Sequence, residues 1–285
     1  MRLSGRRTSS NVEDRRGKGG VMGAGLGIGG VIIVALITFL SGGNIGDVIQ
    51  NVGGQMIQQN GSDYTPTAHE EELAEFASII LAGTEDVWTK EFEKMGKTYQ
   101  PPKMVIFKDQ VNSGCGYASS QTGPFYCSAD QTVYIDLGFF DQMENQMKAG
   151  GDFAYAYVIA HEVGHHVQNL LGILTQVHQK QQQLSEVESN RLNVRLELQA
   201  DYFAGVWANH DNKMYNSLED GDIEEGLNAA SKIGDDYLQK QAQGYAVPDT
   251  FNHGTSAQRN RWLKKGYTYG TISDGDTFSL DYNSL

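Results

Sequence analysis

Residues 152–172, DFAYAYVIAHEVGHHVQNLLG, decide the fold. Their apolar side chains recur at helical spacing, which predicts a long helix with Asp152 as its N-cap. His161 and His165 are four residues apart, so both imidazoles lie on one helical face and can reach a single ion. Burying these histidines and Glu162 in so apolar a helix is costly unless they bind something. The stretch therefore predicts a metal-binding helix in the core.

The segment HEVGH at 161–165 has HExxH spacing. This motif predicts two zinc-ligating histidines, with Glu162 taking a proton from the zinc-bound water. A catalytic zinc needs a third protein ligand and leaves one position open. The longer motif HExxHxxGxxH is not met, because Gln168 and Leu171 stand where it requires glycine and histidine. The alternative source of the third ligand is a glutamate on a later helix.

A second predicted helix, 191–209, supplies such a glutamate. Glu197 and Asp201 are four residues apart and share one face of this helix. We expect Glu197 to be the third ligand and Asp201 to accept a hydrogen bond from a ligating imidazole and orient it. The other interpretation, two solvent-facing carboxylates, conflicts with the apolar sequence ADYFAGVWA around and after Asp201.

The remaining pattern predicts an α+β protein, mostly helical with a small β-sheet. Helices are expected at 70–95, 222–243 and from about Thr255, a solvated helical hairpin at 176–189, and short strands at 104–107 and 132–137. The second strand segment, TVYIDL, is a candidate edge strand along which an extended peptide could pair.

The first twenty residues are basic, and the next twenty carry no charge. The basic side chains are Arg2, Arg6, Arg7, Arg15, Arg16 and Lys18. Residues 21–40 include VIIVALITFL and are about as long as a helix that spans a bilayer. A cleaved signal peptide and a buried core helix are the alternatives. The positive-inside rule then predicts a cytoplasmic head at 1–20, a transmembrane helix at 21–40, a flexible stalk at 41–67 and an exported domain at 68–285.

The charge balance bears on the class of partner. Asp and Glu number 35 against 22 Lys and Arg, which gives a formal net charge of −13. Nucleic-acid binding needs clustered Lys and Arg that neutralise phosphates, and here the cluster is confined to the short head. We therefore expect no nucleic-acid partner.

The two cysteines of the chain, Cys115 and Cys127, flank the short segment GYASSQTGPFY. In an exported domain a closely spaced pair predicts a local disulfide. In a reducing compartment both would remain free thiols. Two sulfurs alone make a poor zinc site, so we do not interpret them as ligands.

Several blocks along nearly the whole chain resemble, in order, a bacterial family, the putative neutral zinc metallopeptidases. They are GRRTSSNVEDRRG, PPKMVIF, SGCGYASSQTGPFYC, VYIDLGFF, GDFAYAYVIAHEVGHHVQNLLGI, RLELQADYFAGVWA and FNHGTSAQRNRW. The resemblance implies a zincin-like fold, an exported domain and peptidase activity on an unidentified peptide or protein. One departure is Tyr202, where the family usually has cysteine.

The segment His253 to Arg259 resembles the His…Arg segment that follows the Glu-x-x-x-Asp helix in membrane-associated gluzincins. By that resemblance, His253 stabilises the oxyanion or caps the zinc, and Arg259 pairs with Asp201. The alternative is a surface-loop histidine that precedes a helix N-cap at Thr255 or Ser256.

Together these features predict a membrane-anchored zinc metallopeptidase with one Zn²⁺ per chain. It would sit in the bacterial cell membrane as a single-pass protein, with its N-terminus inside and its catalytic domain outside. The alternative is a non-catalytic, envelope-anchored assembly or interaction protein that uses zinc as a structural staple. Glu162 favours the enzyme, because a structural zinc site needs no general base beside its ligands.

Overall fold

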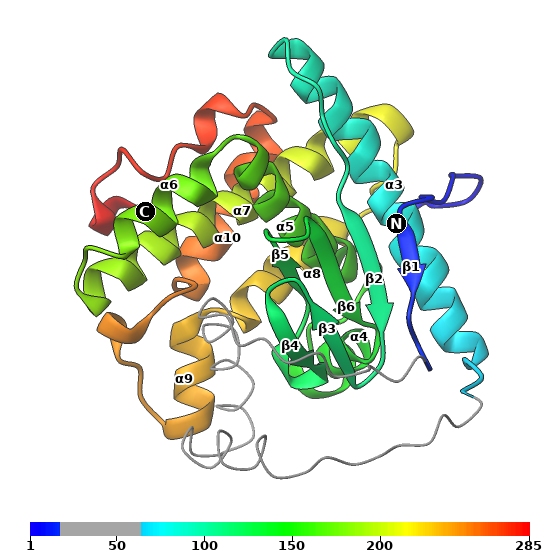
Figure 1. The fold of residues 1–285 in the computed structure, drawn as a ribbon, viewed down its shortest axis with the longest axis horizontal. Helices are drawn as coiled ribbons and strands as arrows, with labels where there is room; N and C mark the ends of the chain where they lie inside the picture. The colour runs from blue at the N-terminus through cyan, green and yellow to red at the C-terminus, as the bar shows by residue number, and fades with distance from the viewer. Residues whose placement is uncertain (18–63) are drawn as a thin grey trace.

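The computed structural model describes residues 1–17 and 64–285, which form helices packed around a small sheet (Figure 1). The helices are α3 (Ala68–Lys94), α4 (Gly138–Gln142), α5 (Asp152–Leu170), α6 (Ile173–Gln181), α7 (Glu186–Tyr215), α8 (Asp222–Lys232), α9 (Asp235–Gln243) and α10 (Ser256–Tyr269). The strands are β1 (Val12–Asp14), β2 (Lys103–Phe107), β3 (Gln110–Ser113), β4 (Gly116–Ser119), β5 (Phe125–Cys127) and β6 (Thr132–Asp136). The predicted α+β class, mostly helical with a small sheet, is confirmed.

The main sheet has the strand order β1-β2-β6-β5. Strands β1, β2 and β6 are parallel, whereas β5 runs antiparallel to β6. The prediction that TVYIDL forms an edge strand is wrong, because β6 lies between β2 and β5 and all five of its residues are buried. A strand buried in this way is apolar on both faces, so its sequence does not distinguish a central position from an edge. The edge is β5.

Helix α5 lies in the centre of the molecule, in contact with α3, α7 and α8 and with strands β5 and β6. Neighbours on all sides explain why its sequence is apolar around nearly the whole circumference. The helix begins one residue earlier than a cap at Asp152 would place it, because Gly151 holds the N-cap position and Asp152 is the first helical residue. An acidic side chain in the first turn still favours the helix through its dipole.

Gly164 sets the distance between α5 and α7. A Cβ atom at this position would lie 3.0 Å from the backbone oxygen of Ala200 and 3.2 Å from its Cα. Only glycine therefore allows the two helix backbones to approach this closely without displacement. The contact falls between His161 and His165 on one helix and between Glu197 and Asp201 on the other, so it brings these side chains together.

The predicted helix at 222–243 is interrupted. It consists of α8 and α9, which are separated at Ile233 and Gly234. Gly234 lies against the start of α10, where a Cβ atom would come 2.3 Å from the backbone nitrogen of Ser256. The amphipathic pattern runs through the interruption, so the break depends on tertiary packing. It places Asp235 at the first turn of α9, beside the loop that precedes α10.

The basic head packs into the domain. Strand β1 pairs with β2 and extends the sheet at the edge opposite β5. Arg6 forms a two-pronged ion pair with Asp211 of α7, at 2.6 and 2.9 Å, and that carboxylate is fully buried. The side chains of Ser9 and Asn11 donate to Glu85 of α3, which is also buried. Because a buried carboxylate needs partners, the head satisfies charges that belong to the core.

This packing contradicts the predicted localisation, a single-pass protein of the bacterial cell membrane with its N-terminus inside and its domain outside. One span between head and domain would put them on opposite sides of a bilayer, yet they pack against each other. Within residues 1–17 and 64–285, no helix has the length and apolar character to cross a membrane. The predicted span at 21–40 and stalk residues 41–63 lie outside the described residues.

Candidate metal centre

Helices α5 and α7 bring His161, His165 and Glu197 into one group of potential ligands. Their ligand atoms all lie within 4.8 Å of one another. Nε2 of His161 is 3.2 Å from Glu197 Oε2, and Nε2 of His165 is 3.5 Å from Glu197 Oε1. Bonds of about 2.0–2.1 Å to a tetrahedral zinc place neighbouring ligands about 3.4 Å apart. Two imidazoles and a carboxylate at this spacing fit a zinc ion.

A charged network holds His161. Its Nδ1 lies 2.8 Å from Asp201 Oδ1, on the next turn of α7 after Glu197. Arg259 donates from Nε and Nη2 to the two oxygens of Asp201, both at 2.9 Å. The hydroxyl of Tyr157 donates to Asp201 Oδ1 at 2.6 Å. Asp201 therefore binds three groups at once, and its bond to Nδ1 leaves Nε2 of His161 free for a metal.

A neutral network holds His165. Its Nδ1 lies 2.9 Å from Oε1 of Gln168, one turn further along α5. The amide nitrogen of Gln168 donates to Leu196 O at 2.8 Å and to Gln199 Oε1 at 3.1 Å. Gln199 in turn donates to Gly275 O at 2.9 Å. Since the amide nitrogen is committed to these acceptors, Oε1 must face the ring and accept from Nδ1–H. Nε2 of His165 is therefore the free nitrogen, as in His161.

The two networks give the imidazoles different pKa values. Burial disfavours the charged form of His161, but Asp201 and Glu197 outweigh it and raise its pKa to about 10. Burial dominates at His165 and lowers its pKa to about 4, because its Nδ1 partner is an uncharged amide. Glu197 is also buried, but the facing imidazoles of His165 and His161 lower its pKa and keep it ionised. The group thus retains a carboxylate and one neutral imidazole at neutral pH.

Glu162 neighbours the group without belonging to it. Burial raises the pKa of its carboxyl to about 7 and Glu197 adds to this rise, while His161 and a hydrogen bond from the Tyr126 backbone oppose it. A carboxyl group with a pKa near neutrality can both accept and return a proton in that pH range. The backbone of β5 at Tyr126 therefore lies close to Glu162.

Side chains of β5 and α5 hold this edge strand in place. The hydroxyl of Tyr126 lies 2.9 Å from Nδ1 of His166 and accepts from Asn169 at 3.0 Å. Nε2 of His166 donates to Gln100 O at 2.7 Å, so Nδ1 is free to accept from Tyr126. His166, which directly follows the second histidine of HExxH, is fully buried and links helix to strand.

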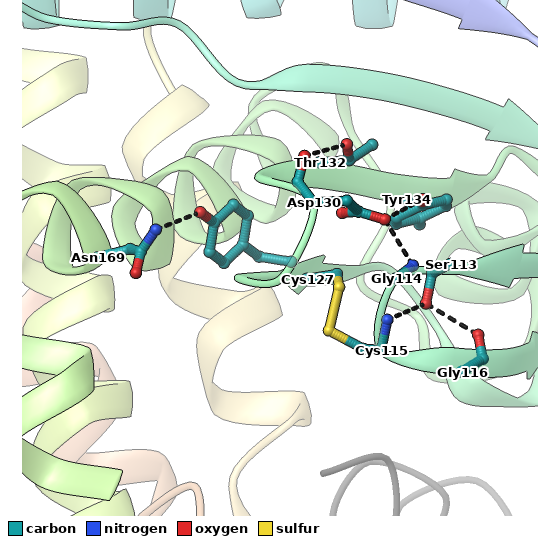
Figure 2. Close-up of a disulfide and its surroundings, with 10 residues drawn as sticks. Ser113, Gly114, Cys115, Gly116, Cys127, Asp130, Thr132, Tyr134 and Asn169 are labelled. Atoms are coloured by element: carbon teal, nitrogen blue, oxygen red, sulfur yellow. Dashed lines mark hydrogen bonds between the residues drawn. A yellow bond between two sulfur atoms is a disulfide. The ribbon is translucent and has the colours of Figure 1, made fainter. Parts of the chain in front are cut away.

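A disulfide between the two cysteines anchors the C-terminal end of β5. Cys127, its last residue, is bonded to Cys115 at the tip of the β3–β4 hairpin (Figure 2). The hairpin tip is also tied to the sheet by Asp130, which accepts from the Gly114 backbone and from the Tyr134 hydroxyl at 2.6 and 2.7 Å. The disulfide thus supports the strand next to Glu162 and contributes no metal ligand.

His253 is partly buried beside the donor group but is not a member of it. Its side chain is 12% exposed, and it lies in the loop before α10, whose N-cap is Thr255 as the alternative of a loop histidine expected. Burial disfavours its charge, but Asp235 raises its pKa above the ordinary value, and Glu197 adds to the rise. Arg259 pairs with Asp201, at the position that the resemblance implied.

Three residues of the site were not identified by sequence reasoning: Tyr157, Gln168 and Asp235. Tyr157 could have been identified from helical spacing. It precedes His161 by one turn and thus lies on the same side of α5 as the candidate ligands. Gln168 follows His165 by three residues, which also places it on that face. Asp235 has no such signal, because its role depends on the break between α8 and α9.

The chain belongs to the family described as putative neutral zinc metallopeptidases, whose family model matches residues 1–278. It is 52% identical over 286 residues to the uncharacterized protein YpfJ of Escherichia coli (strain K12), covering 98% of this chain and 99% of that one. It is 44% identical over 191 residues to the uncharacterized protein Rv2575 of Mycobacterium tuberculosis (strain H37Rv), covering 64% of each chain. No solved structure matches. The family match confirms the resemblance seen in the sequence.

Proposed function

We propose that this protein is a zinc-dependent peptidase with a zincin-like fold and with its site between α5 and α7. The observation that carries the proposal is a three-membered donor group with a carboxyl group of raised pKa beside it. Structural zinc sites are usually closed by four protein ligands, whereas catalytic ones keep a position open. Among the described residues, the group contains three such ligands.

His161, His165 and Glu197 would hold one zinc ion per chain, with Asp201 and Gln168 orienting the two imidazoles. Zinc, when bound, supplies Lewis-acid chemistry, because it polarises a carbonyl oxygen and lowers the pKa of water. The protein's part is to fix the direction of each ligand before the ion arrives. Both Nδ1 atoms are already engaged, so neither ring can turn without breaking a buried hydrogen bond.

Glu162 would act as the general base and then as the general acid. It takes a proton from the attacking water as the water oxygen bonds to the scissile carbonyl carbon. It returns that proton to the amide nitrogen as the C–N bond breaks, which releases a free amine and a carboxylic acid that then ionises by giving its proton to the amine or to water. A pKa of about 7 suits both steps at neutral pH.

The substrate would be a peptide or protein segment in an extended conformation, paired with β5. This strand is one of the two edge strands of the main sheet, and its backbone at Tyr126 lies close to Glu162. A peptide added to such an edge gains backbone hydrogen bonds that do not depend on its sequence. The scissile bond would then pass over the donor group.

His253 would stabilise the oxyanion that develops on the scissile carbonyl. It lies near enough to Glu197 to affect the pKa of that carboxyl, yet outside the donor group. A donor placed where charge develops in the transition state contributes to kcat more than to KM.

The test is Glu162→Gln. This change removes the base but no metal ligand, so we expect the variant to keep its zinc and to lose at least about a hundredfold in peptide hydrolysis. Elemental analysis measures the zinc, and digestion of a diverse peptide library with and without chelator measures turnover. Glu75→Gln, on the exposed side of α3, is the control and should match the wild type.

Undiminished hydrolysis by Glu162→Gln would refute the mechanism. A wild-type protein that binds one zinc and cleaves no peptide would instead indicate a structural role for the metal.

A further inference from the structure

One carboxylate shapes the whole loop that carries His253. Oδ2 of Asp235 accepts the backbone N–H groups of Asn252, His253 and Gly254, at 2.8, 2.7 and 2.9 Å. The backbone N–H of Asp235 donates back to Gly254 O at 2.9 Å. Four hydrogen bonds thus fix the path of the loop relative to the first turn of α9.

The second oxygen of the same carboxylate holds the imidazole. Oδ1 of Asp235 lies 3.1 Å from Nδ1 of His253, and the Asp235 side chain is 8% exposed. The bond commits Nδ1–H to Asp235, because a carboxylate only accepts. Nε2 makes no hydrogen bond with any residue that the structure describes. The ring is close enough to Glu197 for each group to shift the pKa of the other.

The neighbouring residue makes a useful contrast. Asp236 also sits in the first turn of α9 and also anchors the segment before α10, where its Oδ1 accepts from the backbone and the hydroxyl of Ser256, at 2.7 and 3.0 Å. It has no hydrogen bond to the His253 ring. The two aspartates therefore share the task of holding the loop, and Asp235 alone orients the imidazole.

We propose that Asp235 is a positioning residue, which accepts Nδ1–H of the protonated His253 ring so that Nε2–H is presented to the scissile carbonyl oxygen. The proposal rests on the proposed peptidase function. A donor lowers the barrier most when its direction is set before charge develops, because no reorganisation is then needed during the reaction. A ring held only by its loop would sample other rotamers and would lack the carboxylate that favours a proton on both ring nitrogens.

Asp235→Asn tests this role. An asparagine can keep its oxygen on the backbone N–H groups, and its NH₂ group then meets Nδ1 and cannot accept from it. We expect kcat to fall at least about tenfold with KM within about twofold, and zinc content to be unchanged. His253→Ala should lose roughly a hundredfold. The double variant should be no slower than His253→Ala, because Asp235 acts through that ring.

Asp236→Asn is the matched control, since it weakens the same loop without touching the ring. We expect it to stay within about threefold of the wild type in kcat. Equal losses in Asp235→Asn and Asp236→Asn would overturn the proposal, because both would then reflect a loosened loop. A double variant clearly slower than His253→Ala would also overturn it.

A readout independent of activity separates this proposal from the peptidase function. Nitrogen-15 NMR of the zinc-loaded full chain, labelled at histidine and assigned with His253→Gln, reports whether Nδ1 of His253 carries a proton. We expect a protonated Nδ1 in the wild type and its loss in Asp235→Asn. A bare Nδ1 in the wild type would refute the positioning role even in an active enzyme. A protonated Nδ1 in a protein without peptidase activity would refute the proposed function and leave the Asp235–His253 contact established.

Discussion

The two imidazoles of the candidate metal centre are both held by a hydrogen bond at Nδ1, but one partner is a charged carboxylate and the other is a neutral amide. Asp201 holds His161 by Nδ1 and is itself paired with Arg259, whereas the amide of Gln168 holds His165. Nε2 faces Glu197 in both rings, but the pKa is about 10 for His161 and about 4 for His165. Orientation and charge are therefore separable tasks: a neutral amide suffices for the first, and only a carboxylate supplies the second.

The largest effect should follow from removing the charged partner. In Asp201→Asn, Arg259 loses its buried counterion and His161 loses its anionic acceptor. We expect zinc affinity to fall by about 10- to 100-fold and the free energy of unfolding to fall by about 3 kcal/mol. Competition with a zinc chelator measures the first, and urea denaturation measures the second.

Asp211→Asn is the control for this change. Asp211 lies on the same helix, is fully buried and pairs with Arg6, but it is remote from the metal ligands along α7. It should lose a similar amount of stability and keep its zinc affinity. Equal zinc affinities in the two variants would show that the contrast between the histidines has no bearing on metal binding.

The pH dependence of zinc binding should show the same asymmetry. Zinc binds neutral imidazole, so His161, with its pKa of about 10, must release a proton, while His165, with its pKa of about 4, has none to release. At pH 8 Glu162 is already mostly ionised, since its pKa is about 7. We expect about one proton released per zinc, and affinity that rises about tenfold per pH unit between pH 7.5 and 8.5.

Calorimetric titration in buffers of different ionisation enthalpy counts this proton. The release should shrink in Asp201→Asn, because the carboxylate that raises the pKa of His161 is gone. A wild-type protein that releases no proton at pH 8 would contradict the assignment of charge to His161.

The smallest effect should follow from removing the uncharged partner of His165, Gln168. Gln168→Met removes the acceptor for Nδ1 of His165 and leaves Leu196 O and Gln199 Oε1 without their donor. We expect zinc affinity to fall less than about tenfold, and the free energy of unfolding to fall by about 1–2 kcal/mol. The same chelator competition and urea denaturation apply.

Gln199→Met serves as the comparison, because it disturbs the same network one step away from the ring. It should affect stability but leave zinc affinity close to that of the wild type. A loss of zinc affinity in Gln168→Met as large as that in Asp201→Asn would mean that orientation, and not charge, dominates metal binding.

The helix that carries the two histidines could be predicted because its information is local. Two histidines four residues apart in an apolar helix imply a shared face wherever the helix lies. The same holds for Glu197 and Asp201 on α7, which the structure places against that face. The pairing of α5 with α7 needed more than periodicity, since it depends on the close approach that Gly164 allows.

The basic head shows where local information misleads. A cluster of arginines before an uncharged stretch is typical of a cytoplasmic flank, and the predicted topology followed from it. In the structure Arg6 neutralises Asp211, a carboxylate about two hundred positions away that is buried in α7. A charge pattern gives the sign of a segment's net charge. It does not identify the partner of that charge, which can equally be a membrane surface or a buried acidic side chain.

The α+β class, the helices that carry the candidate ligands and the family could all be inferred from the amino-acid sequence. The place of β5 at an edge of the sheet, the packing of the head against the domain, and the contacts of Gln168 with His165 and of Asp235 with His253 became visible only in the folded chain. The reason is physical. Helical periodicity is set by neighbours within a few residues, whereas the partner of a buried polar group is whichever residue the folded chain brings within hydrogen-bond distance.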